Sequence, residues 1–144
     1  MQDFPHHYVV SALSTPTGTV TVRAKDLEDI QSSAPPEFGG PEGNWSPETL
    51  LVGAVADCFV LTLRAVARAS RLEWLEVDCS ATGELDKTDT GNRFTKMTVK
   101  VDLLIPAGGD AGRAQRILEK AEHNCLITNS LNCEVVLDAH IREG

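Results

Sequence analysis

One long apolar stretch, "VGAVADCFVLTLRAVARAS" at residues 52–70, limits most strongly what this chain can fold into. Its apolar residues recur with helical spacing, and further apolar residues fill the gaps between them, so the first half is apolar on nearly every side. Such a helix is either buried at the centre of a domain or half covered by another subunit. The charged side chains share one remaining stripe, formed by Asp57, Arg64, Arg68 and Arg71.

The residues before this stretch mark where the helix begins. In "NWSPETLL", Ser46 is a candidate N-cap and Pro47 suits the first helical position. Glu48 then complements the positive end of the helix dipole.

The rest of the chain alternates between strand and helix patterns. Two strands are expected at residues 6–14 and 18–26, followed by a Pro- and Gly-rich loop at 32–45. After the long helix, the expected elements are strands at 73–86 and 95–106, a helix capped by Asp110, a short helical turn at 125–132 and a strand at 133–141. This order predicts an α+β fold in a single domain over residues 1–144.

Charge and apolar content narrow the class of protein. The net charge of −8 disfavours nucleic acid or an anionic membrane as a partner. The N-terminal "MQDFPHHYVV" lacks the pattern of a secretory signal, and the apolar run near residues 50–63 is too short to span a bilayer. We therefore expect a cytoplasmic protein.

The four cysteines, Cys58, Cys79, Cys125 and Cys133, are the main candidates for chemistry. None forms a C-x-x-C pair or has a histidine at zinc-ligand spacing, so we expect no metal site. Cys79 and Cys133 occupy inward-facing strand positions and are interpreted as core residues, and Cys58 taken alone has the same interpretation. Cys125 differs because it opens a polar segment, where a helix N-terminus would favour a thiolate.

Three motifs in order resemble the OsmC/Ohr family of thiol-dependent peroxidases. "SPETLLVGAVADCF" at 46–59 is similar to the family's cysteine helix, and "CLITNSLN" at 125–132 is similar to its second-cysteine motif. "GELDKTDTGNRFTKMTVKV" at 83–101 resembles the central hairpin of the OsmC branch. The resemblance covers the chain from about residue 8 to residue 141.

The resemblance implies both a fold and an activity. The fold would be an intertwined homodimer in which antiparallel sheets wrap around two long central helices. The activity would be reduction of organic hydroperoxides, and less well of hydrogen peroxide, in defence against oxidative stress. Cys58 would form a sulfenic acid, Cys125 would condense with it to a disulfide, and an external dithiol (lipoyl-type or a small thiol) would reduce that bond. No cofactor is implied, because sulfur carries the redox chemistry.

Helix geometry restricts how Glu48, the third implied catalytic residue, could take part. Glu48 precedes Cys58 by ten residues, so the two lie roughly 15 Å apart along one helix. If both serve one site, Glu48 comes from the partner chain. Otherwise Glu48 is a first-turn residue that favours the helix dipole.

The chain departs from the family pattern at the arginine that faces the sulfur. The two usual positions hold Pro16 and Glu37. Arg93 and Arg23 are the candidate substitutes for stabilising a thiolate, and the alternative is that both are solvated surface charges. These departures favour a second hypothesis, in which the chain is a binding module for a small hydrophobic ligand with little or no peroxidase activity.

Overall fold

The structure is a computed structural model that describes all residues from Met1 to Gly144. The chain forms two compact units, Met1–Leu50 and Leu51–Gly144, which are described in turn. The assignment of residues 1–144 to a single domain stays a prediction.

The first unit contains a three-stranded antiparallel sheet in the order β1-β2-β3. Its strands are β1 (Ser11–Leu13), β2 (Val20–Arg23) and β3 (Ile30–Ser32), and the 3-10 turn η1 (Pro36–Phe38) follows. The first two strands are shorter than predicted. β3 is not predicted from the pattern, because three residues are too few to display an alternation of apolar and polar side chains.

The long helix α1 spans Pro47–Ala69 and begins as predicted. The Ser46 hydroxyl oxygen accepts the backbone N–H of Thr49 at 3.1 Å, and the Thr49 hydroxyl accepts the N–H of Ser46 at 2.8 Å. This reciprocal cap satisfies two backbone donors at the helix start. The C-terminal end has Arg71 in the left-handed region, at φ 55°, where glycine is the usual residue.

The second unit is built on the sheet β4-β5-β6, which is formed by β4 (Glu76–Thr88), β5 (Gly91–Ile105) and β6 (Glu134–Glu143). β4 and β5 form the predicted hairpin, with Thr88 paired to Gly91 across the turn. Gly91 has φ 114°, a conformation that a residue with a Cβ rarely adopts. Between β5 and β6 lie α2 (Ala111–His123), capped by Asp110 as predicted, and the short α3 (Leu126–Asn129).

One feature of the predicted fold needs correction. The first sheet and the β4–β5 pair are antiparallel as expected, but β6 pairs parallel to β5, so the second sheet is mixed. The reason is the connection: α2 and α3 carry the chain back along the sheet, and a strand that follows such a crossover runs in the same direction as the one before it.

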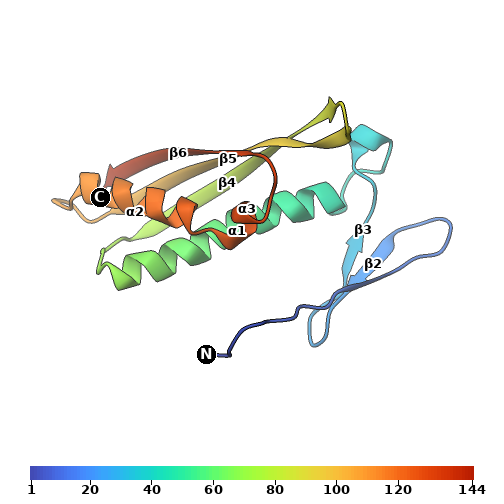
Figure 1. Ribbon diagram of the computed structural model, residues 1–144, viewed down its shortest axis with the longest axis horizontal. Helices are drawn as coiled ribbons and strands as arrows, with labels where there is room; N and C mark the ends of the chain where they lie inside the picture. The colour runs from blue at the N-terminus through green and yellow to red at the C-terminus, as the bar shows by residue number, and fades with distance from the viewer. The chain divides into compact units, whose positions relative to one another are not determined.

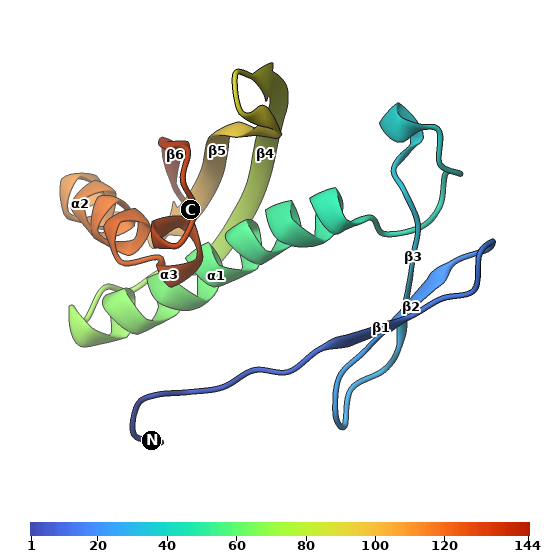
Figure 2. The ribbon, with the colours of Figure 1, turned by 45° about the vertical axis from the view of Figure 1, so that its right-hand side comes forward.

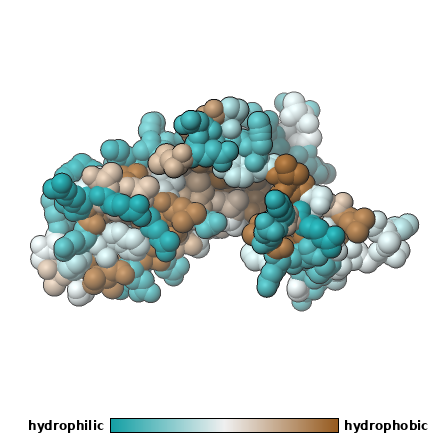
Figure 3. Space-filling view, turned by 90° about the horizontal axis from the view of Figure 1, so that it is seen from below, coloured by the Kyte–Doolittle hydropathy of each residue, from teal (hydrophilic) through white to brown (hydrophobic).

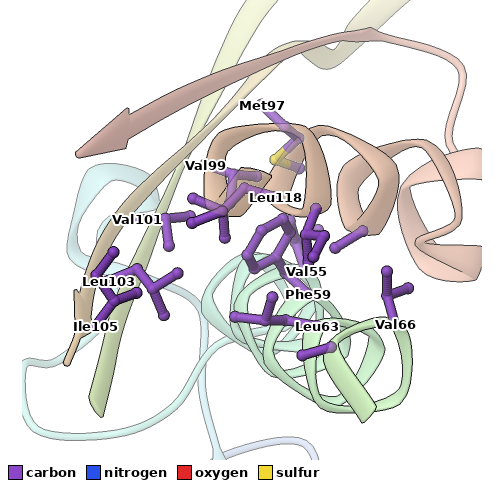
Figure 4. Packing of buried hydrophobic residues seen from close by; sticks show 14 residues of the cluster. Val55, Phe59, Leu63, Val66, Met97, Val99, Val101, Leu103, Ile105 and Leu118 are labelled. Carbon is purple, nitrogen blue, oxygen red and sulfur yellow. The ribbon is translucent and has the colours of Figure 1, made fainter. Parts of the chain in front are cut away.

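The core of the second unit lies between this sheet and the two longer helices. Figures 1 and 2 show α1 and α2 on the same face of the sheet. The alternate residues of β5 that face the helices are almost completely buried: Met97, Val99, Val101, Leu103 and Ile105. Figure 4 shows Phe59 and Leu63 of α1 and Leu118 of α2 pointing into this layer.

A bulge in the hairpin changes which β5 residues face inward. The register shifts between Glu84 and Leu85, and Phe94 joins the packed residues beyond it. A Cβ on Gly83 would lie 2.8 Å from Phe94 Cε1 and 2.8 Å from Val52 Cγ2. Glycine at position 83 is therefore what lets Phe94 pack against α1.

The rest of the chain covers only part of the apolar surface of α1. The helix has 23 residues, longer than the apolar run at 50–63 suggested, and by length and composition alone it could cross a membrane. Its most apolar 18-residue window has a mean hydropathy of 2.0, but 28% of that window is buried. The buried side of the helix is formed by Val55, Phe59, Leu63, Val66 and Ala67.

Candidate active site

Cys58 lies in the middle of α1, at the edge of the buried side of the helix, and is partly exposed. One turn later, the Thr62 hydroxyl donates to the Cys58 carbonyl at 2.7 Å, and its oxygen lies 3.9 Å from Cys58 Sγ. A hydroxyl at this position fixes a polar group beside a thiol that is otherwise surrounded by apolar helix. The sequence motifs did not point to Thr62 as a site residue. Its spacing of four residues from Cys58, which places it on the same helix face, is the signal that could have done so.

Cys125 is the N-cap residue of α3 and is 1% exposed. It follows α2 directly, and the Cys125 carbonyl accepts the Asn129 N–H at 3.0 Å and the Thr128 hydroxyl at 3.1 Å. The predicted helical turn after Cys125 is therefore present, and it holds the thiol on the inner side of the unit.

The thiols of Cys58 and Cys125 are neighbours in the folded chain. Burial raises the pKa of Cys125 above its ordinary value, the Thr128 N–H and hydroxyl lower it, and the neighbouring Cys58 thiol raises it again. Two thiols that influence each other in this way lie at short range, although 66 residues separate them in the sequence. Both are free thiols in this structure.

A third thiol, Cys79, belongs to the same neighbourhood. It projects from β4 toward the core, where burial first and then the charges of Asp78 and Cys125 raise its pKa to about 11. At neutral pH Cys79 is therefore a protonated, weakly nucleophilic thiol. The alternation of β4 indicated its inward face correctly, but gave no sign that Cys125 lies nearby. Cys133 also packs against the core.

Glu48 lies in the first turn of α1, and its Oε2 atom is buried without a hydrogen-bond partner. It lines a cavity of about 520 Å³ within the first unit. The other lining residues are mainly apolar and include Val20, Val22, Pro35, Phe38 and Leu50. A buried carboxylate oxygen with no donor is costly, which makes Glu48 a polar group available to a molecule that enters this cavity.

The two candidate arginines have partners of their own. Arg23 binds Asp29 through two hydrogen bonds of 2.9 and 2.8 Å, which raise the pKa of Arg23 and lower that of Asp29. Arg93 donates to the Asn132 carbonyl at 2.8 Å. In the single chain, each guanidinium therefore bonds to a group other than Cys58.

This arrangement can carry thiol redox chemistry. A partly exposed thiol on a helix and a buried thiol on a neighbouring turn can form and break a disulfide without an added cofactor. The structure brings Cys58 and Cys125 together and adds Cys79, while Glu48 lies near the start of the helix that carries Cys58.

Comparison with known sequences points to one family. A family model described as "OsmC-like protein" matches residues 39–140. The chain is 30% identical over 125 residues to the peroxiredoxin OsmC of Escherichia coli, covering 87% of this chain and 86% of the relative. It is 27% identical over 117 residues to the uncharacterized protein YmaD of Bacillus subtilis, covering 78% of each.

Solved structures give the same fold. An OsmC-like protein of unknown function from Vibrio cholerae matches with a TM-score of 0.86 at 20% identity, covering 94% of this chain and 100% of the other. An organic hydroperoxide resistance protein from Elizabethkingia anophelis matches with a TM-score of 0.80 at 20% identity, covering 96% and 100%. The predicted α+β architecture is therefore confirmed.

Proposed function

Because the chain belongs to the OsmC-like protein family, we propose that it is a thiol-dependent peroxidase that reduces organic hydroperoxides. The placement of a partly exposed thiol, Cys58 on α1, near a buried thiol, Cys125 at the start of α3, carries this proposal. The names of relatives support the class of reaction, since they include a peroxiredoxin and an organic hydroperoxide resistance protein.

The proposed reaction has two steps on this chain. The Cys58 thiolate attacks the terminal oxygen of the hydroperoxide, the O–O bond breaks, and a proton from solvent gives the alcohol and a Cys58 sulfenic acid. Cys125 then attacks the oxidised sulfur, which forms the Cys58–Cys125 disulfide and releases water. A cytoplasmic dithiol, lipoyl-type or small, reduces the disulfide and restores both thiols.

Turnover of an organic hydroperoxide in the presence of a dithiol tests this proposal. Cys58→Ser should abolish turnover, whereas Cys79→Ser, a matched change at a neighbouring thiol, should keep most of it. After one equivalent of hydroperoxide without reductant, mass spectrometry should find the disulfide between Cys58 and Cys125. Full activity of Cys58→Ser, or a disulfide elsewhere, would contradict the mechanism.

Glu48 and a homodimer enter the proposal together. α1 is one continuous helix, so Glu48 and Cys58 of the same chain lie about 15 Å apart along it. The buried, unpartnered Oε2 of Glu48 supports a role in a site that a second chain completes. Arg93 and Arg23 are proposed as cations that stabilise the thiolate only if the dimer frees them from Asn132 and Asp29.

Mixing two inactive variants tests the shared site. Glu48→Gln and Cys58→Ser chains, refolded together in equal amounts, form mixed dimers in which one of the two sites has both native residues. About a quarter of all sites are then intact, so turnover should recover to about a quarter of the native value. No recovery in dimers shown to have exchanged chains would exclude Glu48 acting across the dimer.

A second candidate function rests on the cavity beside Glu48. A mostly apolar cavity of about 520 Å³ is within the size range of small-molecule sites. In a binding module, a small hydrophobic ligand would occupy this cavity and Cys58→Ser would leave its affinity unchanged. Calorimetric titration of the peroxide-inactive variant with such a ligand separates the two functions.

A further inference from the structure

We propose that the cavity beside Glu48 binds an organic cation of one kind, a protonated primary amine attached to a short hydrocarbon chain. This inference rests on the second candidate function, because it takes the same cavity as a ligand site, and it adds the chemistry of the ligand. The cysteine motifs do not bear on this cavity, so the ligand is argued from the cavity wall alone.

The cavity is formed within the first unit. All of its lining residues lie between Ala12 and Leu50, and they come from the sheet β1-β2-β3, the segment after it, the turn η1 and the start of α1. Its volume of about 520 Å³ is within the range of small-molecule sites. The ligand site therefore lies in one part of one chain.

Apolar side chains form most of the cavity wall. Val20, Val22 and Leu50 line it together with Phe38, which is 55% exposed. Figure 3 shows apolar surface patches among hydrophilic ones on the side from which it is viewed. A hydrocarbon chain in the cavity would remove apolar surface such as the Phe38 ring from water, so each buried methylene of the ligand should strengthen binding about fourfold.

Glu48 is the one charged residue that lines the cavity. Its Oε2 atom is buried without a donor, and none of the chain's ion pairs includes it. Glu48 lies in the first turn of α1, where the helix dipole favours the negatively charged form of the side chain. A cation beside either carboxylate oxygen would stabilise this charge, because the two oxygens share it.

The rest of the wall favours a ligand that donates hydrogen bonds. Ser33 donates its hydroxyl proton to the Ala34 carbonyl at 3.2 Å, which leaves lone pairs of the hydroxyl oxygen to accept. No lysine, arginine or histidine lines the cavity. A carboxylate or phosphate ligand would therefore meet Glu48 with no compensating cation, whereas a primary ammonium brings three donors and a positive charge.

Titration followed by amide NMR tests the site, because it gives both the affinity and the residues whose signals shift. Hexylammonium should shift the amide signals of Val20, Val22 and Glu48. It should bind about tenfold more tightly than hexanol, because a charged hydrogen bond is stronger than a neutral one, and hexanoate should not bind at the same concentrations. Equal affinities of hexanol and hexylammonium, or shifts confined to other residues, would overturn the proposal.

Two matched variants isolate the carboxylate of Glu48. Glu48→Gln keeps the shape and removes the charge, so it should weaken hexylammonium binding about tenfold and leave hexanol binding nearly unchanged. Glu42→Gln removes the same charge from an exposed residue outside the cavity and should change neither affinity. An unchanged affinity in Glu48→Gln, or an equal loss in Glu42→Gln, would show that the amine binds the acidic surface at large and would overturn the proposal.

Ligand chain length gives a readout that needs no substitution in the cavity. Affinity should rise about fourfold per methylene from butylammonium to hexylammonium, and a flat series would overturn the proposal. A second copy of the chain that covers the cavity would also overturn it, because hexylammonium would then have no affinity that depends on Glu48.

The same titrations in Cys58→Ser separate this inference from the peroxidase. Because the cavity does not include Cys58, this variant should bind hexylammonium with the native affinity. A native chain that binds the amine but turns over no hydroperoxide would contradict the proposed peroxidase alone. A native chain that turns over hydroperoxide but binds no amine would overturn this inference alone.

Discussion

The rate at which the Cys58–Cys125 disulfide forms should rise steeply with pH. Burial holds the pKa of Cys125 above its ordinary value, so its thiol is almost entirely protonated between pH 6 and 8. The attacking species is the thiolate, whose fraction increases about tenfold per pH unit below the pKa. We therefore expect about a hundredfold faster disulfide formation at pH 8 than at pH 6.

Rapid quenching measures this step separately from turnover. The reduced protein is mixed with one equivalent of an organic hydroperoxide, without reductant, and quenched in acid after milliseconds to seconds. Mass spectrometry of the alkylated chains then counts sulfenic acid and disulfide. A rate that is flat from pH 6 to 8, or that levels off within this range, would refute the argument, because a raised pKa places the plateau at higher pH.

Thr128 allows the same argument to be tested at constant pH. Its N–H and hydroxyl lower the pKa of Cys125, so Thr128→Val, which removes the hydroxyl, should raise that pKa and slow disulfide formation severalfold at pH 7. Ser130→Ala is the matched control, because the Ser130 hydroxyl donates to the Leu126 carbonyl. A faster step in Thr128→Val would show that the hydroxyl does not stabilise the thiolate.

Three further predictions concern the scaffold. Gly83→Val should lower the free energy of unfolding by about 1–3 kcal/mol in urea titrations, because its Cβ would lie 2.8 Å from atoms of Phe94 and Val52. Arg71→Gly should raise it by about 0.5–1 kcal/mol in the same assay, because it relieves a left-handed residue at φ 55°. The pKa of Cys79 is about 11 in the folded chain and 9.0 for an ordinary thiol. Its protonated thiol therefore contributes fully to the free energy of unfolding below pH 9, and this contribution is lost as the pH rises through 11. Between pH 9 and 11, Cys79→Ala should therefore lose about 1 kcal/mol less free energy of unfolding than the native chain, after allowance for solvent exposure.

Local signals predicted much of the fold. The Ser46 cap, the first-turn Pro47 and the Asp110 cap each have a defined physical role, and the structure has α1 and α2 beginning there. The direction of β6 was not available from such signals. It depends on how α2 and α3 carry the chain back, and an antiparallel and a parallel partner for β5 have the same alternating pattern.

The candidate site was harder to derive because its thiols come from three separate elements. Cys58 is on α1, Cys79 on β4 and Cys125 at the start of α3, and no spacing in the sequence relates them. Family likeness related Cys58 to Cys125, but Cys79 stayed a core residue because strand alternation gives the face of a side chain and not its neighbour across the core. Tertiary packing supplies that information.

Burial then suggests which thiol reacts first. Cys125 is 1% exposed, so a hydroperoxide has no route to its sulfur in the folded chain, whereas Cys58 is partly exposed on α1. Burial also raises the pKa of Cys125, so its thiol is mostly protonated, which limits its reaction with other oxidants in solution. The proposed order of steps, in which Cys58 reacts before Cys125, is therefore supported by the places that α1 and α3 give the two sulfur atoms.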